Sequence, residues 1–174
     1  MSEISTLPAR VFGSVSVAMV TPFHEDGSLD IDSTVHLADH LVQQGCDSIL
    51  LSGTTGESPT THQPEKDDLV REVKAALKGR AFVLAGAGSN DTAHAVRIAQ
   101  GAQEAGADGL LVVAPYYNRP SQEGVYQHIL AITEASDLPV MIYDIPGRTG
   151  VTLEFDTLRR LSDHPRILAV KDAT

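Results

Sequence analysis

The sequence is poor in the residues that mark several common protein classes. Among 174 residues it has one cysteine, Cys46, so an intrachain disulfide and a cysteine-rich metal site are both excluded. Only 13 lysines and arginines oppose 23 aspartates and glutamates, and the net charge of -10 disfavours nonspecific binding to nucleic acid or an anionic membrane. No apolar run approaches the ~20 residues that span a bilayer, and Met1–Gly13 lacks the layout of a secretory signal. We therefore expect a soluble, cytoplasmic protein.

What the sequence does contain is a regular succession of short apolar runs. The chain is 42% hydrophobic and 21% charged, which is typical of a globular protein with one core. Runs rich in Val, Ile and Leu start about thirty residues apart, and such runs are typical of buried strands. The six predicted strands are Val15–Val20, Ser48–Leu51, Ala81–Ala85, Gly109–Val113, Val140–Tyr143 and Ile167–Val170.

Segments with helical periodicity separate these runs. The first has an apolar stripe from Ile31 to Val42 and stops at Gly45, a residue suited to the left-handed position after a helix. The second has Pro64 in its first turn and closes at Gly79. The other predicted boundaries are Asn90 or Asp91 as the cap of the third helix and Gly106 at its end, Ser121 as the cap of the fourth, and Thr152 as the cap of the fifth.

The strict alternation of strands and helices predicts an α/β fold with parallel strands and right-handed crossovers. Gly45-Cys46-Asp47 and Gly106-Ala107-Asp108 each join a helix end to the next strand, two βα units apart, which supports a repeat. Two architectures fit: an open doubly wound sheet, or a single domain over 1–174 formed by the first six βα strands of a (β/α)8 TIM barrel.

Polar side chains follow several of the predicted strands, where parallel α/β folds collect their functional groups. The second strand runs into the segment 53–56, where two glycines flank Thr54 and Thr55 and expose amides and hydroxyls to an anion. The fifth ends in Tyr143, a candidate proton relay, with Arg148 nearby as a fork for a carboxylate. The alternative for each residue alone is a solvated turn or a rim side chain.

Lys171 follows the sixth apolar run. An ammonium held at the end of an apolar strand loses hydration, which can lower its pKa toward neutrality, and a neutral amine can attack a ketone to form a Schiff base. The alternative is a lysine that reaches out to solvent. The segment 86–88 lacks the third glycine of a dinucleotide fingerprint, so we expect a close-packed turn, and the seven histidines have no metal-ligand spacing.

The order of these motifs resembles the dihydrodipicolinate synthase family of pyruvate-dependent, Schiff-base (class I) aldolases. The matching motifs are Gly-Thr-Thr-Gly-Glu at 53–57, Tyr-Tyr at 116–117, Tyr-x-x-Pro-x-Arg-Thr-Gly at 143–150, and a lysine after an apolar strand at 171. The resemblance implies a TIM barrel that condenses pyruvate with L-aspartate 4-semialdehyde to 4-hydroxy-tetrahydrodipicolinate, in lysine and diaminopimelate biosynthesis. It also implies a homo-oligomer, a tetramer in the family, and no metal or organic cofactor.

The resemblance assigns a role to each motif. Lys171 would be the nucleophile that forms the imine with pyruvate, and Thr54 and Thr55 would bind the pyruvate carboxylate. Tyr143 would be the general acid and base, linked through the Thr55 hydroxyl to Tyr117, which in this family reaches in from a neighbouring subunit.

Related aldolases provide an alternative. N-acetylneuraminate lyases and 2-keto-3-deoxy sugar-acid aldolases share the fold, the lysine and the tyrosine, but Thr54-Thr55 together with Arg148 favours the synthases. In that family Arg148 would hold the carboxylate of the semialdehyde. Two positions depart from the pattern of many members, which have asparagine in place of Asp144 and serine in place of Gly147.

The feedback pocket that binds lysine in this family is matched only in part. Asn90 and Tyr116 agree with it, whereas Gln63, Lys66 and His94 replace two histidines and a glutamate. A cation at position 66 would repel the ammonium of the effector, so we expect weak or absent inhibition by lysine.

The end of the chain is the largest departure. Family members continue through a seventh and an eighth strand, whereas this sequence stops three residues after Lys171. We therefore expect a truncated barrel, and the second hypothesis is a non-catalytic fragment of the synthase.

Overall fold

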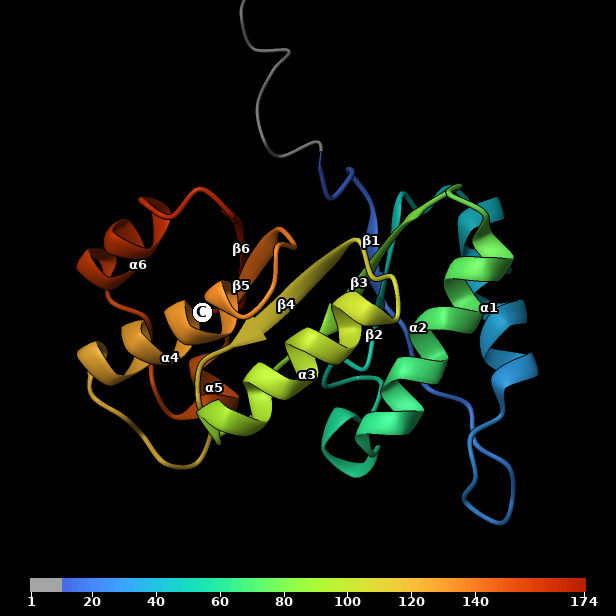
Figure 1. Cartoon of the computed structure of the whole chain (residues 1–174), viewed down its shortest axis with the longest axis horizontal. Helices are drawn as coiled ribbons and strands as arrows, with labels where there is room; N and C mark the ends of the chain where they lie inside the picture. The colour runs from blue at the N-terminus through green and yellow to red at the C-terminus, as the bar shows by residue number, and fades with distance from the viewer. Residues whose placement is uncertain (1–10) are drawn as a thin grey trace, which may run out of the picture.

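The computed structural model describes residues 11–174, which form one six-stranded parallel sheet with helices between the strands (Figure 1). The elements in chain order are β1 Ser16–Ala18, α1 Ile31–Gln43, β2 Ser48–Leu51, the 3-10 helix η3 Ser58–Thr60, α2 Gln63–Leu77, β3 Phe82–Gly86, α3 Thr92–Glu104, β4 Gly109–Val113, α4 Gln122–Glu134, β5 Val140–Asp144, α5 Pro146–Thr149, α6 Phe155–Ser162 and β6 Ile167–Asp172.

The order of the strands in space decides between the two predicted architectures. Each strand pairs with the next one along the chain, from β1 to β6, with no reversal. An open doubly wound sheet reverses its strand order at a switch point, whereas a barrel does not. The described chain is therefore a half-barrel of six βα strands, as the (β/α)8 prediction required.

Side chains alternate between two faces of the sheet, and each face has its own apolar cluster. Ile49, Leu110 and Ile142 point to the face that packs against the helices and are almost fully buried. Leu84 and Leu111 point to the opposite, inner face, where Tyr143 belongs to the same cluster. Burial of each aliphatic side chain contributes roughly 1.5–3 kcal/mol, so this alternation is strongly specified. It also directs Tyr143 to the inside of the half-barrel.

Most of the predicted helix boundaries are confirmed. Asp91 caps α3 by accepting a hydrogen bond from the Ala93 amide at 2.9 Å, and Ser121 caps α4. Gly45 and Gly106 follow α1 and α3 with left-handed backbone, φ +101 and +91. These positions favour glycine because a Cβ is unfavourable there.

The prediction that Thr152 caps the fifth helix is wrong. A short helix, α5, precedes it, and α6 begins only at Phe155. The segment between them is held by other partners: the Thr152 carbonyl accepts from the side chain of Gln122 at 2.8 Å, and the Leu153 amide donates to Asp144. Because its polar groups bond to α4 and β5, this segment stays extended.

β3 and β5 differ from their apolar runs by at most one residue at either end, whereas β1 and β6 differ by more. β1 is confined to Ser16–Ala18, and the flanking Val15 and Val20 are half exposed. β6 continues to Asp172, so Lys171 lies within the strand and not after it. A register irregularity opposite Val140 and Met141 shifts β6 by one residue and places Lys171 beside Tyr143.

The aspartates of the repeats Gly45-Cys46-Asp47 and Gly106-Ala107-Asp108 bind main-chain amides at the amino-terminal edge of the sheet. Asp47, before β2, accepts hydrogen bonds from the amides of Ser14 and Val15 at 2.7 and 2.8 Å. Asp108, before β4, accepts one from the Val83 amide at 2.8 Å. Each carboxylate thus ties its own strand to the preceding one, which sets the strand register.

No helix within residues 11–174 is long and apolar enough to cross a membrane. The prediction about a secretory signal in Met1–Gly13 lies mostly outside the described residues.

Candidate active site

A cavity opens at the carboxyl ends of β2 to β5, on the inner side of the half-barrel. Its walls include Thr54 and Ser58 from the segment after β2, Gly86 and Gly88 from the end of β3, Tyr116 after β4, and Tyr143 and Arg148 from β5 and α5. This is the end of the sheet at which βα-barrels place their chemistry. The same edge was predicted from the residue types alone.

The segment after β2 is packed tightly against its neighbours. A Cβ at Gly86 would lie 2.1 Å from the carbonyl oxygen of Ser52, so only glycine allows β3 to approach this closely. A Cβ at Gly88 would lie 2.4 Å from the side chain of Val113. The predicted close-packed turn at 86–88 is therefore confirmed. On the other side, the Thr21 hydroxyl donates to the Gly56 carbonyl at 2.7 Å.

The two threonines of this segment differ in position. Both are exposed, but Thr54 lines the cavity whereas Thr55 is not part of the wall. No hydrogen bond joins Thr55 to Tyr143 or Tyr117 within the described chain. The structure thus brings Thr54 to the cavity and leaves the role of Thr55 a prediction.

Lys171 and Tyr143 are side by side on paired strands. They are register partners of β5 and β6, and the Lys171 Nζ lies 4.0 Å from the centroid of the Tyr143 ring. The tyrosine is buried and lines the cavity, whereas the lysine is half-buried next to it. Burial lowers the pKa of Lys171 and so enlarges the fraction of neutral, nucleophilic amine near neutral pH.

Arg148 reaches the cavity from α5, an element absent from the predictions. The side chain is exposed and forms part of the cavity wall. Hydrogen bonds hold the turn that carries Arg148: the Thr149 hydroxyl donates to the carbonyls of Ile145 and Val151, at 3.0 and 2.8 Å. Asp144, one of the two departures noted above, is buried under the turn, and burial raises the pKa of its carboxyl group. A fixed turn with an exposed guanidinium suits the binding of a carboxylate at the entrance.

The two adjacent tyrosines after β4 separate. Tyr116 lines the cavity, whereas Tyr117 points away and is 87% exposed. The backbone of Tyr117 is left-handed, with φ +71, a conformation that costs energy in a non-glycine residue. Within this chain, Tyr117 therefore does not meet Tyr143.

Several wall residues were not predicted from the sequence. Ser58 and Pro59 come from η3, and Thr149 from α5. Serine, proline and threonine are ordinary turn residues, so the sequence offered no reason to assign these three to the cavity beyond their closeness to a motif.

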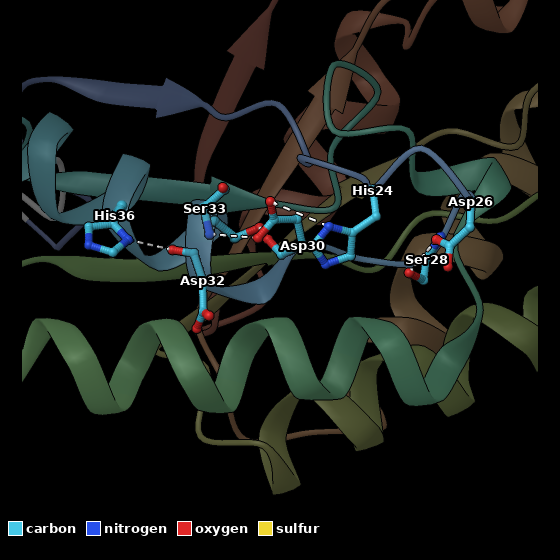
Figure 2. Close-up of polar contacts among 8 residues, drawn as sticks. His24, Asp26, Ser28, Asp30, Asp32, Ser33 and His36 are labelled. Carbon is cyan, nitrogen blue, oxygen red and sulfur yellow. Dashed lines mark hydrogen bonds and ion pairs between the residues drawn. The ribbon is translucent and has the colours of Figure 1, made fainter.

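The acidic segment before α1 contains the N-cap residue of that helix, Asp30. Figure 2 shows Asp30 accepting from the Ser33 amide, which lowers the pKa of Asp30, with His24 at 3.8 Å from its other oxygen. Asp26 accepts from both the amide and the hydroxyl of Ser28, and these bonds lower its pKa. Within residues 11–174, no three His, Cys, Asp or Glu side chains gather as metal ligands would.

Comparison with known proteins identifies the family. A model of the dihydrodipicolinate synthetase family matches residues 11–174. The chain belongs to this family. Proteins named 4-hydroxy-tetrahydrodipicolinate synthase are similar to it: the one from Corynebacterium jeikeium is 58% identical over 93% of this chain, and one from Streptomyces coelicolor is 56% identical over 99%. This chain spans 54% and 58% of those two sequences, about half the length of the curated relatives it matches.

Solved structures of the family have the same half-barrel. The dihydrodipicolinate synthase of Bacillus anthracis superposes with a TM-score of 0.91 at 47% identity, covering 93% of this chain and 56% of that one. The enzyme of Cyanidioschyzon merolae, crystallised with lysine bound, gives a TM-score of 0.92 at 44% identity, covering 94% and 56%. The six βα strands are therefore arranged as in the family barrel.

Proposed function

We propose that this chain carries the Schiff-base chemistry of a 4-hydroxy-tetrahydrodipicolinate synthase, which condenses pyruvate with L-aspartate 4-semialdehyde in lysine and diaminopimelate biosynthesis. The observation that supports it most is the amine of Lys171 against the ring of Tyr143, beside a cavity lined by Thr54 and Arg148. Family membership supports the same reaction. We assign the protein to the cytoplasm, where soluble biosynthetic enzymes of this kind act.

The first half of the reaction uses the lysine and the segment after β2. The neutral amine of Lys171 attacks the ketone carbon of pyruvate, and loss of water gives an iminium. Thr54 and the amides around it bind the pyruvate carboxylate, with Thr55 as a second hydroxyl. The iminium withdraws electrons, so a proton leaves the methyl group and an enamine forms.

The second half joins the two substrates. The enamine carbon attacks the aldehyde of the semialdehyde, the oxygen that becomes an alcohol takes up a proton, and the iminium on Lys171 is restored. The amino group of the second substrate then attacks the iminium carbon, which closes the ring and displaces the amine of Lys171. Tyr143 is the group at the cavity that can move these protons, because its ring lies against Lys171. Arg148 binds the carboxylate of the second substrate through its planar fork. This scheme calls for no metal or organic cofactor.

Tyr117 supports a homo-oligomer, of which the family tetramer is one form. The residue is 87% exposed on a strained backbone, so among residues 11–174 of one chain it has neither burial nor a proton-relay partner. In a second copy it would extend the relay from Thr55 and Tyr143. Thr54-Thr55 with Arg148 favours the synthase reaction over those of N-acetylneuraminate lyases and 2-keto-3-deoxy sugar-acid aldolases.

The test is to trap the imine. The chain is incubated with pyruvate and borohydride, which reduces an iminium to a stable secondary amine, and the modified peptide is mapped by mass spectrometry. We expect one pyruvate-derived adduct on Lys171, lost in Lys171→Met and kept in Lys74→Met, a lysine paired with Asp108 at the other end of the sheet. If a full-length relative reacts under the same conditions and this chain does not, it is a non-catalytic fragment and the proposal is wrong.

A further inference from the structure

Lys66 is a buried lysine that the scheme above does not use. It lies in the first turns of α2, is 7% exposed, and reaches back to η3. Its Nζ donates to the carbonyls of Ser58 and Thr61 at 2.6 and 2.7 Å, and to the Thr61 hydroxyl oxygen at 2.6 Å. An ammonium has three N–H groups, so each of them is matched by one protein oxygen.

No ion pair offsets this buried charge within residues 11–174. Burial lowers the pKa of Lys66 to about 8, while its helix neighbours Glu65 and Asp67 act in the opposite sense. The cost of burying the ammonium is therefore offset mainly by main-chain oxygens, whose positions it fixes in return.

One of the three oxygens that Lys66 contacts, the Ser58 carbonyl, belongs to a residue of the cavity wall. Ser58 and Pro59 line it together with Thr54. The Ser58 amide donates to the Gly53 carbonyl at 3.2 Å, and the Glu57 amide donates to the Thr54 carbonyl at the same distance. Ser58 is thus bonded to the threonine segment through its amide and to Lys66 through its carbonyl.

The backbone of residues 52–57, which carry Thr54 and Thr55, is strained and is kept in place by surrounding contacts. Ser52 and Glu57, at its two ends, both have left-handed backbone, with φ +51 and +56. Non-glycine residues keep this conformation only where surrounding contacts determine it. Glu57 precedes η3 without capping it through its side chain, and its carbonyl accepts from the Thr60 amide and from the hydroxyls of Thr60 and Thr61. Lys66 donates to the same Thr61 hydroxyl and so adds to this support.

We propose that Lys66 is a positioning residue for the substrate carboxylate: its ammonium fixes η3 and, through Ser58, the segment that carries Thr54 and Thr55. This inference rests on the proposed function. It predicts that loss of the ammonium weakens pyruvate binding without changing the reactivity of Lys171, which lies on a different strand.

The experiment compares two variants on the same helix. Lys66→Met keeps a straight, helix-compatible side chain but has no donor, and Lys74→Met removes an ammonium that pairs with Asp108 at 2.6 Å, away from the cavity. Hydrogen exchange of the amides in residues 53–61 reports on the segment itself. Borohydride trapping over a range of pyruvate concentrations gives the half-saturating concentration and the yield at saturation.

For Lys66→Met we expect faster exchange in residues 53–61 and a half-saturating pyruvate concentration raised by about tenfold, equivalent to ~1.4 kcal/mol. The yield at saturation should match that of the wild type, and Lys74→Met should match it in all three quantities. If Lys66→Met does not fold, Lys66→Gln, which keeps two donors on a shorter side chain, should shift both measurements in the same direction.

Unchanged pyruvate binding in the Lys66 variant, with an intact wild-type adduct, overturns the inference, whether or not exchange becomes faster. A lower yield at saturation with unchanged half-saturation also overturns it, because the defect would then lie in the chemistry of Lys171. Failure of the wild type to form any adduct is a different result: it refutes the proposed function, and the positioning role with it.

Discussion

A buried histidine that is not part of the cavity wall should make this protein sensitive to mild acid. His128 lies on α4 and is 3% exposed. Its Nδ1 is 2.8 Å from the Thr92 hydroxyl, and its Nε2 has no partner within the described chain. Burial lowers the pKa of His128 to about 4 from an ordinary value of 6.5, against a weaker opposing effect of Asp91.

The magnitude follows from the difference between the two states. Between pH 6.5 and about 4 the unfolded chain binds a proton at His128 that the folded chain does not, so a fall in pH favours unfolding. Each pKa unit corresponds to ~1.4 kcal/mol, so the free energy of unfolding should fall by ~2 kcal/mol between about pH 7 and about pH 5. The full loss, ~3 kcal/mol, is reached below about pH 4.

The assay is urea unfolding at several pH values, followed by circular dichroism because the chain has no tryptophan. Leucine is apolar and cannot titrate. Between about pH 7 and about pH 5, the free energy of unfolding of His128→Leu should therefore fall by ~2 kcal/mol less than that of the wild type. The control His94→Gln removes an exposed histidine from the adjacent α3 and should retain the wild-type dependence. Parallel curves for wild type and His128→Leu would refute the reasoning, because the acid sensitivity would then belong to other groups.

Further changes test packing, strand register and regulation. Gly86→Ala should lower the free energy of unfolding by roughly 1–3 kcal/mol, because the new Cβ would lie 2.1 Å from a main-chain carbonyl oxygen. Gly147→Ala is the control: its Cβ would have no atom within 4 Å, so the free energy of unfolding should change by less than ~0.5 kcal/mol. Asp108→Ala removes the acceptor of hydrogen bonds from the Lys74 ammonium and the Val83 amide, so the free energy of unfolding in urea should fall by roughly 1–2 kcal/mol. Asp137 is 94% exposed, so Asp137→Ala should leave that free energy nearly unchanged. Free lysine should leave the trapped adduct unchanged, and a marked decrease would contradict the expectation drawn from Lys66.

Much of the fold was predictable because each element has a strong local signal. The apolar runs mark the strands, of which β2 to β5 are buried on both faces, and Asp91 and Ser121 begin helices that have continuous apolar stripes. α5 has neither signal. It consists of Pro146–Thr149 alone and depends on bonds of Thr149 to carbonyls on both sides of it.

The candidate site was predictable in part for a geometric reason. The carboxyl ends of parallel strands meet at one edge of the sheet, so polar residues that follow different strands were predicted to lie close together. Thr54, Tyr143 and Arg148 do line one cavity. The sequence did not indicate that Thr54 lines the cavity whereas Thr55 does not, since neighbours in a turn share composition but not direction.

The sequence by itself determined the alternation of strands and helices, the edge at which polar groups gather and the family, because periodicity, turn residues and motif order are local properties. Only the tertiary structure decided the rest. The unreversed strand order made the sheet a half-barrel, and the register irregularity in β6 placed Lys171 against Tyr143. These features arise from distances between segments, which no local pattern encodes.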